Sequence, residues 1–214
     1  MFHPLYEPRL AQTPFHLLLV LFLAFATVLV GCGATQRAPE KDGLVTIFYE
    51  DGAQVEIISP NGIRVLVDVA DPHVLSRPVT NKDILLTTHK HEDHYVPAFA
   101  KAFPGQQLNM NPGTITVSAV AIQGIASSHE GDVSAWVEKA SNYIYVIETG
   151  GLRIVHFGDI GQNALTPAQL TTIGHVDVAF SQFANYVSYM SIINHKLHLF
   201  YSWSGKRTTF ALIA

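Results

Sequence analysis

Short runs of apolar residues, separated by glycine, proline and polar residues, follow one another along the chain from residue 44 onward. β-Branched and aromatic residues dominate these runs, which is typical of β-strands. Strands are therefore predicted over residues 44–49, 55–58, 63–69, 83–88, 114–126 (as one strand or two), 143–148, 153–157 and 176–180. Asn61-Gly62 and Gly150-Gly151 lie between neighbouring runs and predict hairpin turns.

Only two segments favour helices. Residues 97–103 can form a short helix, and Thr166 followed by Pro167 provides a helix cap with proline at the first helical position. The pattern indicates one strand-rich domain over residues 44–214. Loops at the ends of such strands can hold side chains at fixed distances, as a metal or catalytic site requires.

The first residues of the chain have a different character. Arg9 precedes an apolar run over residues 17–30, and the small residues Gly31, Cys32 and Gly33 follow it. This order is typical of a secretory signal, and the run is shorter than the roughly 20 residues that a membrane-spanning helix needs. Because residues 34–43 are small, polar and charged, they predict a tether. An uncleaved N-terminal anchor is the alternative, and it would also export the domain.

The quartet that ends at Cys32, Leu29-Val30-Gly31-Cys32, resembles the lipobox of bacterial lipoproteins. This resemblance implies a signal peptide over residues 1–31 and lipidation of Cys32, with residues 32–43 as the lipidated tether. The protein would then be anchored by lipid in the bacterial cell envelope, facing the periplasm or the exterior.

Composition and charge narrow the possible partners. Apolar residues make up 48% of the chain and charged residues 14%, which fits a globular protein rather than a disordered one. The net charge is −4 and no run of Lys or Arg is present, so a nucleic-acid partner is not expected. Cys32 is the only cysteine, which excludes an intrachain disulfide. Any metal must therefore be bound by imidazole and carboxylate groups.

The segment 89–94, His-Lys-His-Glu-Asp-His, concentrates three imidazoles and two carboxylates in six residues. In an extended loop, alternate side chains point the same way, so His89 and His91 can bind one ion together. Asp93 shares their parity and His94 faces elsewhere, which leaves room for a second ion. Such ligands suit Zn²⁺, with Fe or Mn as alternatives. A solvated histidine-rich loop is the non-functional interpretation.

The spacing of this segment resembles the H-x-H-x-D-H motif of the metallo-β-lactamase superfamily. The resemblance continues with His129, after a predicted strand, and with Asp159 in a Gly-Asp turn, and it covers roughly residues 44–180. Within the superfamily, residues 142–159 are most similar to the ascorbate-6-phosphate lactonase-like hydrolases.

The resemblance implies an α/β fold, the four-layer αβ/βα sandwich of that family. It also implies a first metal bound by His89, His91 and His129. Asp93 and His94 would bind a second metal, and Asp159 would bridge the two. A water molecule between two cations is hydroxide near neutral pH, and this metal-bound hydroxide would attack an ester, lactone or phosphodiester-type bond of a small-molecule substrate. Asp93 would also act in catalysis by orienting the nucleophile.

The C-terminal tail departs from the family pattern. The family supplies one more metal-binding histidine after a further helix and strand, and residues 186–214 offer only His195 and His198. The family's last segment is therefore expected to be missing or replaced, which leaves the fold incomplete and the second metal site weak, water-filled or empty. A non-catalytic or damaged family member is the alternative function. Di-iron redox relatives resemble a pattern with glutamate in place of His91 and carry a flavin domain, neither of which is present here.

Overall fold

The computed structural model describes residues 43–50, 52–129, 140–162, 164–181, 199–201 and 208–212. The chain divides into two units, Met1–Arg37 and Ala38–Ala214, and all of the described residues belong to the second. The predicted signal peptide and tether, Cys32, His195 and His198 lie outside the described residues. Among the described helices, none has the length and apolar character needed to span a membrane.

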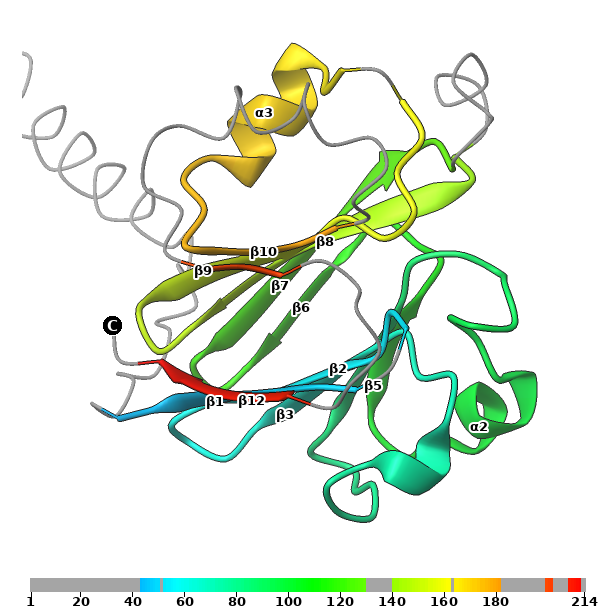
Figure 1. Cartoon of the computed structure of the whole chain (residues 1–214), viewed down its shortest axis with the longest axis vertical. Coiled ribbons are helices and arrows are strands. Elements are labelled where there is room, and N and C mark those ends of the chain that lie inside the picture. The colour runs from blue at the N-terminus through cyan, green and yellow to red at the C-terminus, as the bar shows by residue number, and fades with distance from the viewer. Residues whose placement is uncertain are drawn as a thin grey trace, which may run out of the picture. The chain divides into compact units, whose positions relative to one another are not determined.

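Two mixed β-sheets face each other in the described part of the chain (Figure 1). The first has the order β12-β1-β2-β3-β4-β5, with β1 Val45–Tyr49, β2 Val55–Ile58, β3 Arg64–Val67, β4 Ile84–Thr87, β5 Gln106–Asn109 and β12 Thr208–Leu212. The second has the order β11-β10-β9-β8-β7-β6, with β6 Thr114–Val117, β7 Val120–Ser127, β8 Asn142–Thr149, β9 Leu152–His156, β10 Val178–Phe180 and β11 Leu199–Tyr201.

Apolar side chains from both sheets meet between them and form the main core. Val45, Ile47 and Val65 of the first sheet pack in one cluster with Ile147 and Ile154 of the second, and all five are at most 1% exposed. Burial of these side chains contributes about 1.5–3 kcal/mol each to the free energy of unfolding. This shared core holds the two sheets face to face.

Helices cover the outer faces of both sheets (Figure 1). On the first sheet, α2 (Pro97–Ala102) and the 3₁₀ helix η1 (Pro72–Val74) belong to the connections around β4, and Ala100 and Phe103 pack with Leu66 and Leu85. On the second, α3 (Pro167–Ile173) contributes Ile173 to a cluster with residues of β8, β9 and β10. The order of layers is helix, sheet, sheet, helix, so the predicted αβ/βα sandwich is confirmed.

Helix α3 begins where the sequence predicts it. The Thr166 side chain accepts a hydrogen bond from Gln169 N, and the Gln169 side chain accepts one from Thr166 N, which completes a capping box. Pro167 takes the first helical position, where its missing N–H costs nothing. Gly174 follows with a φ of 62° and ends the helix.

The predicted strands are confirmed with small differences at their ends, but three of the observed strands were not predicted: β5, and β11 and β12 in the C-terminal tail. β5 was not predicted, because its sequence Gln-Gln-Leu-Asn lacks apolar alternation. The segment 114–126 forms two strands, which separate at a turn where Ser118 has a φ of 53°. β3 ends at Val67 instead of residue 69, because Asp68 adopts a φ of 49° and leaves the sheet.

One buried tyrosine links the two sheets next to the predicted metal ligands. The Tyr145 hydroxyl of β8 lies 2.8 Å from Thr87 O at the end of β4 and 3.0 Å from Leu108 O of β5. Burial and the nearby Asp68 carboxylate raise the pKa of Tyr145 well above its ordinary value, so the hydroxyl remains a donor. This contact fixes the end of β4, and with it the start of the His89 loop, against the second sheet.

Candidate metal centre

Three loops that each follow a strand carry the predicted ligands. His89 comes two residues after β4, His129 two residues after β7, and Asp159 three residues after β9. The loops of His129 and Asp159 are joined directly, because Gly161 N donates to Ser128 O at 3.0 Å and residues 129 and 160 form an antiparallel bridge. The prediction that each ligand follows a strand is confirmed.

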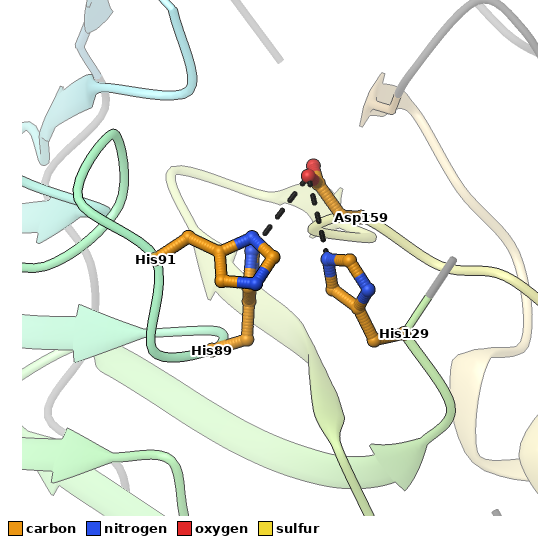
Figure 2. A group of neighbouring side chains, drawn as sticks. All are labelled: His89, His91, His129 and Asp159. Atoms are coloured by element: carbon orange, nitrogen blue, oxygen red, sulfur yellow. Dashed lines mark ion pairs between the residues drawn. The ribbon is translucent and has the colours of Figure 1, made fainter. Parts of the chain in front are cut away.

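Four predicted ligands converge on one point. His89, His91, His129 and Asp159 each offer one ligand atom, and these atoms all lie within 4.8 Å of one another (Figure 2). Asp159 Oδ2 lies 3.6 Å from His89 Nε2 and 3.7 Å from His129 Nε2. These separations are long for hydrogen bonds, but two atoms that bind one tetrahedral Zn²⁺ at 2.0–2.1 Å lie about 3.4 Å apart.

The second predicted set lies on the other side of the same carboxylate. His94 Nε2 is 3.4 Å from Asp159 Oδ1 and 3.6 Å from Asp93 Oδ2. The two oxygens of Asp159 therefore face different groups of nitrogen atoms, an arrangement suited to a bridging ligand. The Asp93 side chain is 62% exposed, whereas that of His94 is fully buried.

The conformation of the 89–94 segment differs from the extended loop that the alternation argument assumed. Residues 92–94 form a turn, and His94 N donates to His91 O at 3.0 Å. His94 consequently folds back beside His89, with 4.0 Å between the ring centroids. His94 nevertheless faces Asp159 Oδ1 whereas His89 faces Asp159 Oδ2, so the two rings border the same carboxylate at different oxygens.

Hydrogen bonding fixes the tautomer of His89. The Thr88 hydroxyl donates its one hydrogen to Asp68 Oδ2 at 2.7 Å, so it accepts at its 3.0 Å contact with His89 Nδ1. His89 Nδ1 therefore carries the proton, and Nε2 presents a bare lone pair to the centre. That Nε2 atom is buried and has no hydrogen-bond partner among the described residues. A buried lone pair of this kind fits a metal ligand.

Asp68 is a functional residue that the sequence analysis missed. It is fully buried at the end of β3, and its Oδ2 lies 2.9 Å from His94 Nδ1, while its Oδ1 accepts a hydrogen bond from Thr88 N at 2.7 Å. A carboxylate behind a histidine orients the opposite nitrogen toward a metal. Its position in the sequence could have indicated it, because Asp68 follows the apolar strand β3 just as His89 follows β4. The two strands are parallel neighbours, so the residues after them lie close together.

The electrostatics of the centre follow from burial and from these pairs. Burial, with a smaller contribution from the charge of His94, lowers the pKa of His89 to about 4, so His89 is neutral. Burial also acts to lower the pKa of His94, but its hydrogen bonds to Asp159 and Asp68 outweigh burial and raise the pKa to about 10. For Asp68 and Asp159, burial acts to raise the pKa, and the pairing with His94 holds both pKa values below the ordinary range.

The donor set fits a metal of the zinc type. The imidazoles of His89, His91 and His129 and the carboxylate of Asp159 converge at the first candidate metal position. The same Asp159 carboxylate, with His94 and Asp93, borders the second candidate position. Nitrogen and oxygen donors of this kind suit Zn²⁺ or a related transition metal and leave its identity open. The geometry thus brings together all six of the ligands expected among residues 89–159.

The other described histidines lie apart from this cluster or behind it. His73 is exposed in η1, and His175 is exposed with Nε2 2.7 Å from Asp177 Oδ1. His156 is buried behind the centre, where its Nδ1 accepts a hydrogen bond from Gly158 N and its Nε2 lies 3.2 Å from Ala53 O. Burial lowers the pKa of His156, which is therefore neutral.

A comparison with protein families gives one match. A family model described as a beta-lactamase superfamily domain matches residues 46–190, which includes every described ligand candidate. No curated protein matches the chain.

The chain is similar to several solved structures at low sequence identity. A candidate Zn-dependent hydrolase of the metallo-β-lactamase superfamily from Thermotoga maritima is 23% identical over 72% of this chain and 75% of its own, with a TM-score of 0.50. A candidate metal-dependent hydrolase from Parabacteroides distasonis is 18% identical over 67% and 72%, with a TM-score of 0.48. CmlA, a diiron β-hydroxylase from Streptomyces venezuelae, is 14% identical over 76% and 41%, with a TM-score of 0.42.

Proposed function

The chain belongs to the β-lactamase superfamily, and we propose that it is a metal-dependent hydrolase of a small-molecule ester, lactone or phosphodiester. The observation that carries the proposal is the convergence of His89, His91, His129 and Asp159 within 4.8 Å, with His94 on the far side of Asp159. His89, His91 and His129 would hold the first ion, Asp93 and His94 the second, and Asp159 would bridge them. Bound there, Zn²⁺ would supply a Lewis acid and make water acidic enough to ionise near neutral pH.

The protein's own residues orient these groups and control access to them. Asp68 accepts from His94 Nδ1 and the Thr88 hydroxyl accepts from His89 Nδ1, so that both rings are held with Nε2 facing Asp159. The ligands differ in exposure: His89 and Asp159 are at most 6% exposed, whereas His91 and Asp93 are exposed. A substrate would therefore approach past His91 and Asp93, where the Asp93 carboxylate can accept a hydrogen bond from the nucleophile and orient it.

Metal content is the direct test of this proposal. We expect the purified full-length protein to contain two equivalents of metal per chain by elemental analysis, which also distinguishes zinc from iron and manganese. Chelation should abolish hydrolysis of a generic phosphodiester or lactone, and metal addition should restore it. One equivalent or none, without turnover, would contradict the hydrolase and favour a non-catalytic family member.

We also propose that Cys32 is lipidated and anchors the protein in the bacterial envelope. The support is the sequence of residues 29–32 together with the apolar run before it. In a bacterial host, mass spectrometry of the purified protein is expected to find an acylated Cys32 at the N-terminus. The Cys32→Ala variant should retain residues 1–31 and carry no acyl chain. A wild-type protein that begins at Met1 without acylation would support an uncleaved anchor instead.

A further inference from the structure

The start of β8 makes hydrogen bonds to all three loops that carry the proposed ligands. Tyr143 N donates to Thr88 O at 3.0 Å, beside His89. His129 N donates to Ser141 Oγ at 2.9 Å, and Asp159 N donates to Asn142 Oδ1 at 3.2 Å. Three consecutive residues thus contact loops that are far apart in the sequence, and Asn142 contributes through its side chain.

Asn142 is fully buried, and both ends of its amide are in use. Nδ2 donates to Ser127 Oγ at 2.7 Å and to Phe157 O at 2.8 Å, while Oδ1 accepts from Asp159 N. The orientation of the amide is determined, because the Phe157 carbonyl can only accept and the Asp159 N–H can only donate. One side chain therefore joins the end of β7, which leads to His129, to the turn that presents Asp159.

The turn before Asp159 packs directly on this amide. Gly158 has a φ of +57°, and a Cβ atom added there would lie 2.3 Å from Asn142 Oδ1 and 2.7 Å from Thr88 Cβ. The Gly158 backbone therefore packs directly against the side-chain amide of Asn142. If the amide is removed, Phe157 O and Asp159 N lose a buried partner, and the turn gains space to move.

We propose that Asn142 is a positioning residue that sets the distance between Asp159 and His129 and thereby the metal affinity of the centre. The inference rests on the proposed function, since it concerns the metal held there. Asn142 offers no ligand itself: its amide nitrogen faces Ser127 Oγ and Phe157 O, and its oxygen faces the Asp159 main chain. Residues that orient metal ligands in this way typically change metal affinity about 10–100-fold when they are lost.

The test compares Asn142 with an equally buried amide elsewhere. Gln54 is 1% exposed; it accepts hydrogen bonds from Ala70 N and Asp71 N and donates one to Asp71 O, and in the described part of the chain its side chain hydrogen-bonds to none of the proposed ligands. Zinc affinity is measured by competition with a chromophoric chelator for the full-length wild type, Asn142→Ala, Ser127→Ala and Gln54→Ala. Amide hydrogen exchange at Asp159 in zinc-free protein is measured beside it.

We expect Asn142→Ala to bind zinc about 10–100-fold more weakly than wild type. Ser127→Ala, which removes one of the three bonds, should weaken binding less, and Gln54→Ala should lower thermal stability without changing zinc affinity. Exchange at the Asp159 amide should accelerate in Asn142→Ala alone. If Asn142→Ala does not fold, unchanged affinity in Ser127→Ala overturns the inference and weakened affinity supports it.

The two proposals fail in different ways. A wild-type protein that binds no zinc would overturn the proposed function and this inference with it. A wild type that binds zinc, together with an Asn142→Ala variant that binds it equally well, would overturn this inference alone. Equal loss of affinity in Asn142→Ala and Gln54→Ala would assign a general structural role to Asn142 and would also overturn it.

Discussion

Replacing His91 with alanine is expected to lower hydrolysis by more than about 100-fold and to reduce the bound metal. The loss of a residue that merely orients a ligand already costs about 10–100-fold, and His91 is itself a proposed ligand. His91 is the most informative of these histidines to replace, because its side chain is exposed whereas that of His89 is buried, with 2% exposure. Alanine at position 91 therefore leaves no cavity in the core, so folding stability and metal binding can be separated.

His175→Ala is the matched control for this substitution. His175 is also exposed, and it pairs with Asp177 away from the centre. Turnover, metal content by elemental analysis and the urea unfolding midpoint are compared for the two variants and wild type. His175→Ala should retain metal and turnover. Full turnover in His91→Ala with unchanged metal content would remove His91 from the site and contradict the ligand assignment.

The part of the centre that could be predicted from the sequence is the part that is local or follows strands. Residues 89–94 stand out by composition, and His129 and Asp159 were placed by the resemblance to the metallo-β-lactamase superfamily, with each following a run of strand-forming residues. In the second sheet β7 and β9 both run antiparallel to β8, so the loops that follow these two strands lie at the same edge.

The supporting residues depend on contacts that no local pattern contains. Asp68 reaches His94, 26 residues away, only because β3 and β4 are parallel neighbours. Asn142 contacts Asp159 through a hydrogen bond across 17 residues, and its role depends on the close approach of Gly158. Residues 92–94 likewise form a turn where an extended loop was predicted. In this turn His94 contacts two carboxylates from outside its own segment, those of Asp68 and Asp159.

A second large effect, on stability rather than activity, is expected at the buried Arg64. Its guanidinium is fully buried and pairs with Glu56 Oε2 at 3.0 Å and Asp83 Oδ2 at 2.8 Å, two carboxylates that are also fully buried. It further donates to the carbonyl oxygens of Arg77 and Pro78, and so ties the connection between β3 and β4 to the sheet. Arg64→Met would leave the buried Glu56 carboxylate without a cationic partner and Asp83 with Arg77 alone, which costs about 3–5 kcal/mol.

Arg77→Met provides the matched control, because Arg77 pairs with the same Asp83 at 2.9 Å from a side chain that is 38% exposed. Solvent screening limits the loss there to about 0–1 kcal/mol, and Asp83 keeps Arg64 as its partner. Urea unfolding of both variants gives the comparison. Because Asp68 and His89 follow the two strands that this connection joins, Arg64→Met should also weaken zinc binding, and Arg77→Met should not. Equal, small losses of unfolding free energy in the two variants would show that Arg64 does not hold this connection in place.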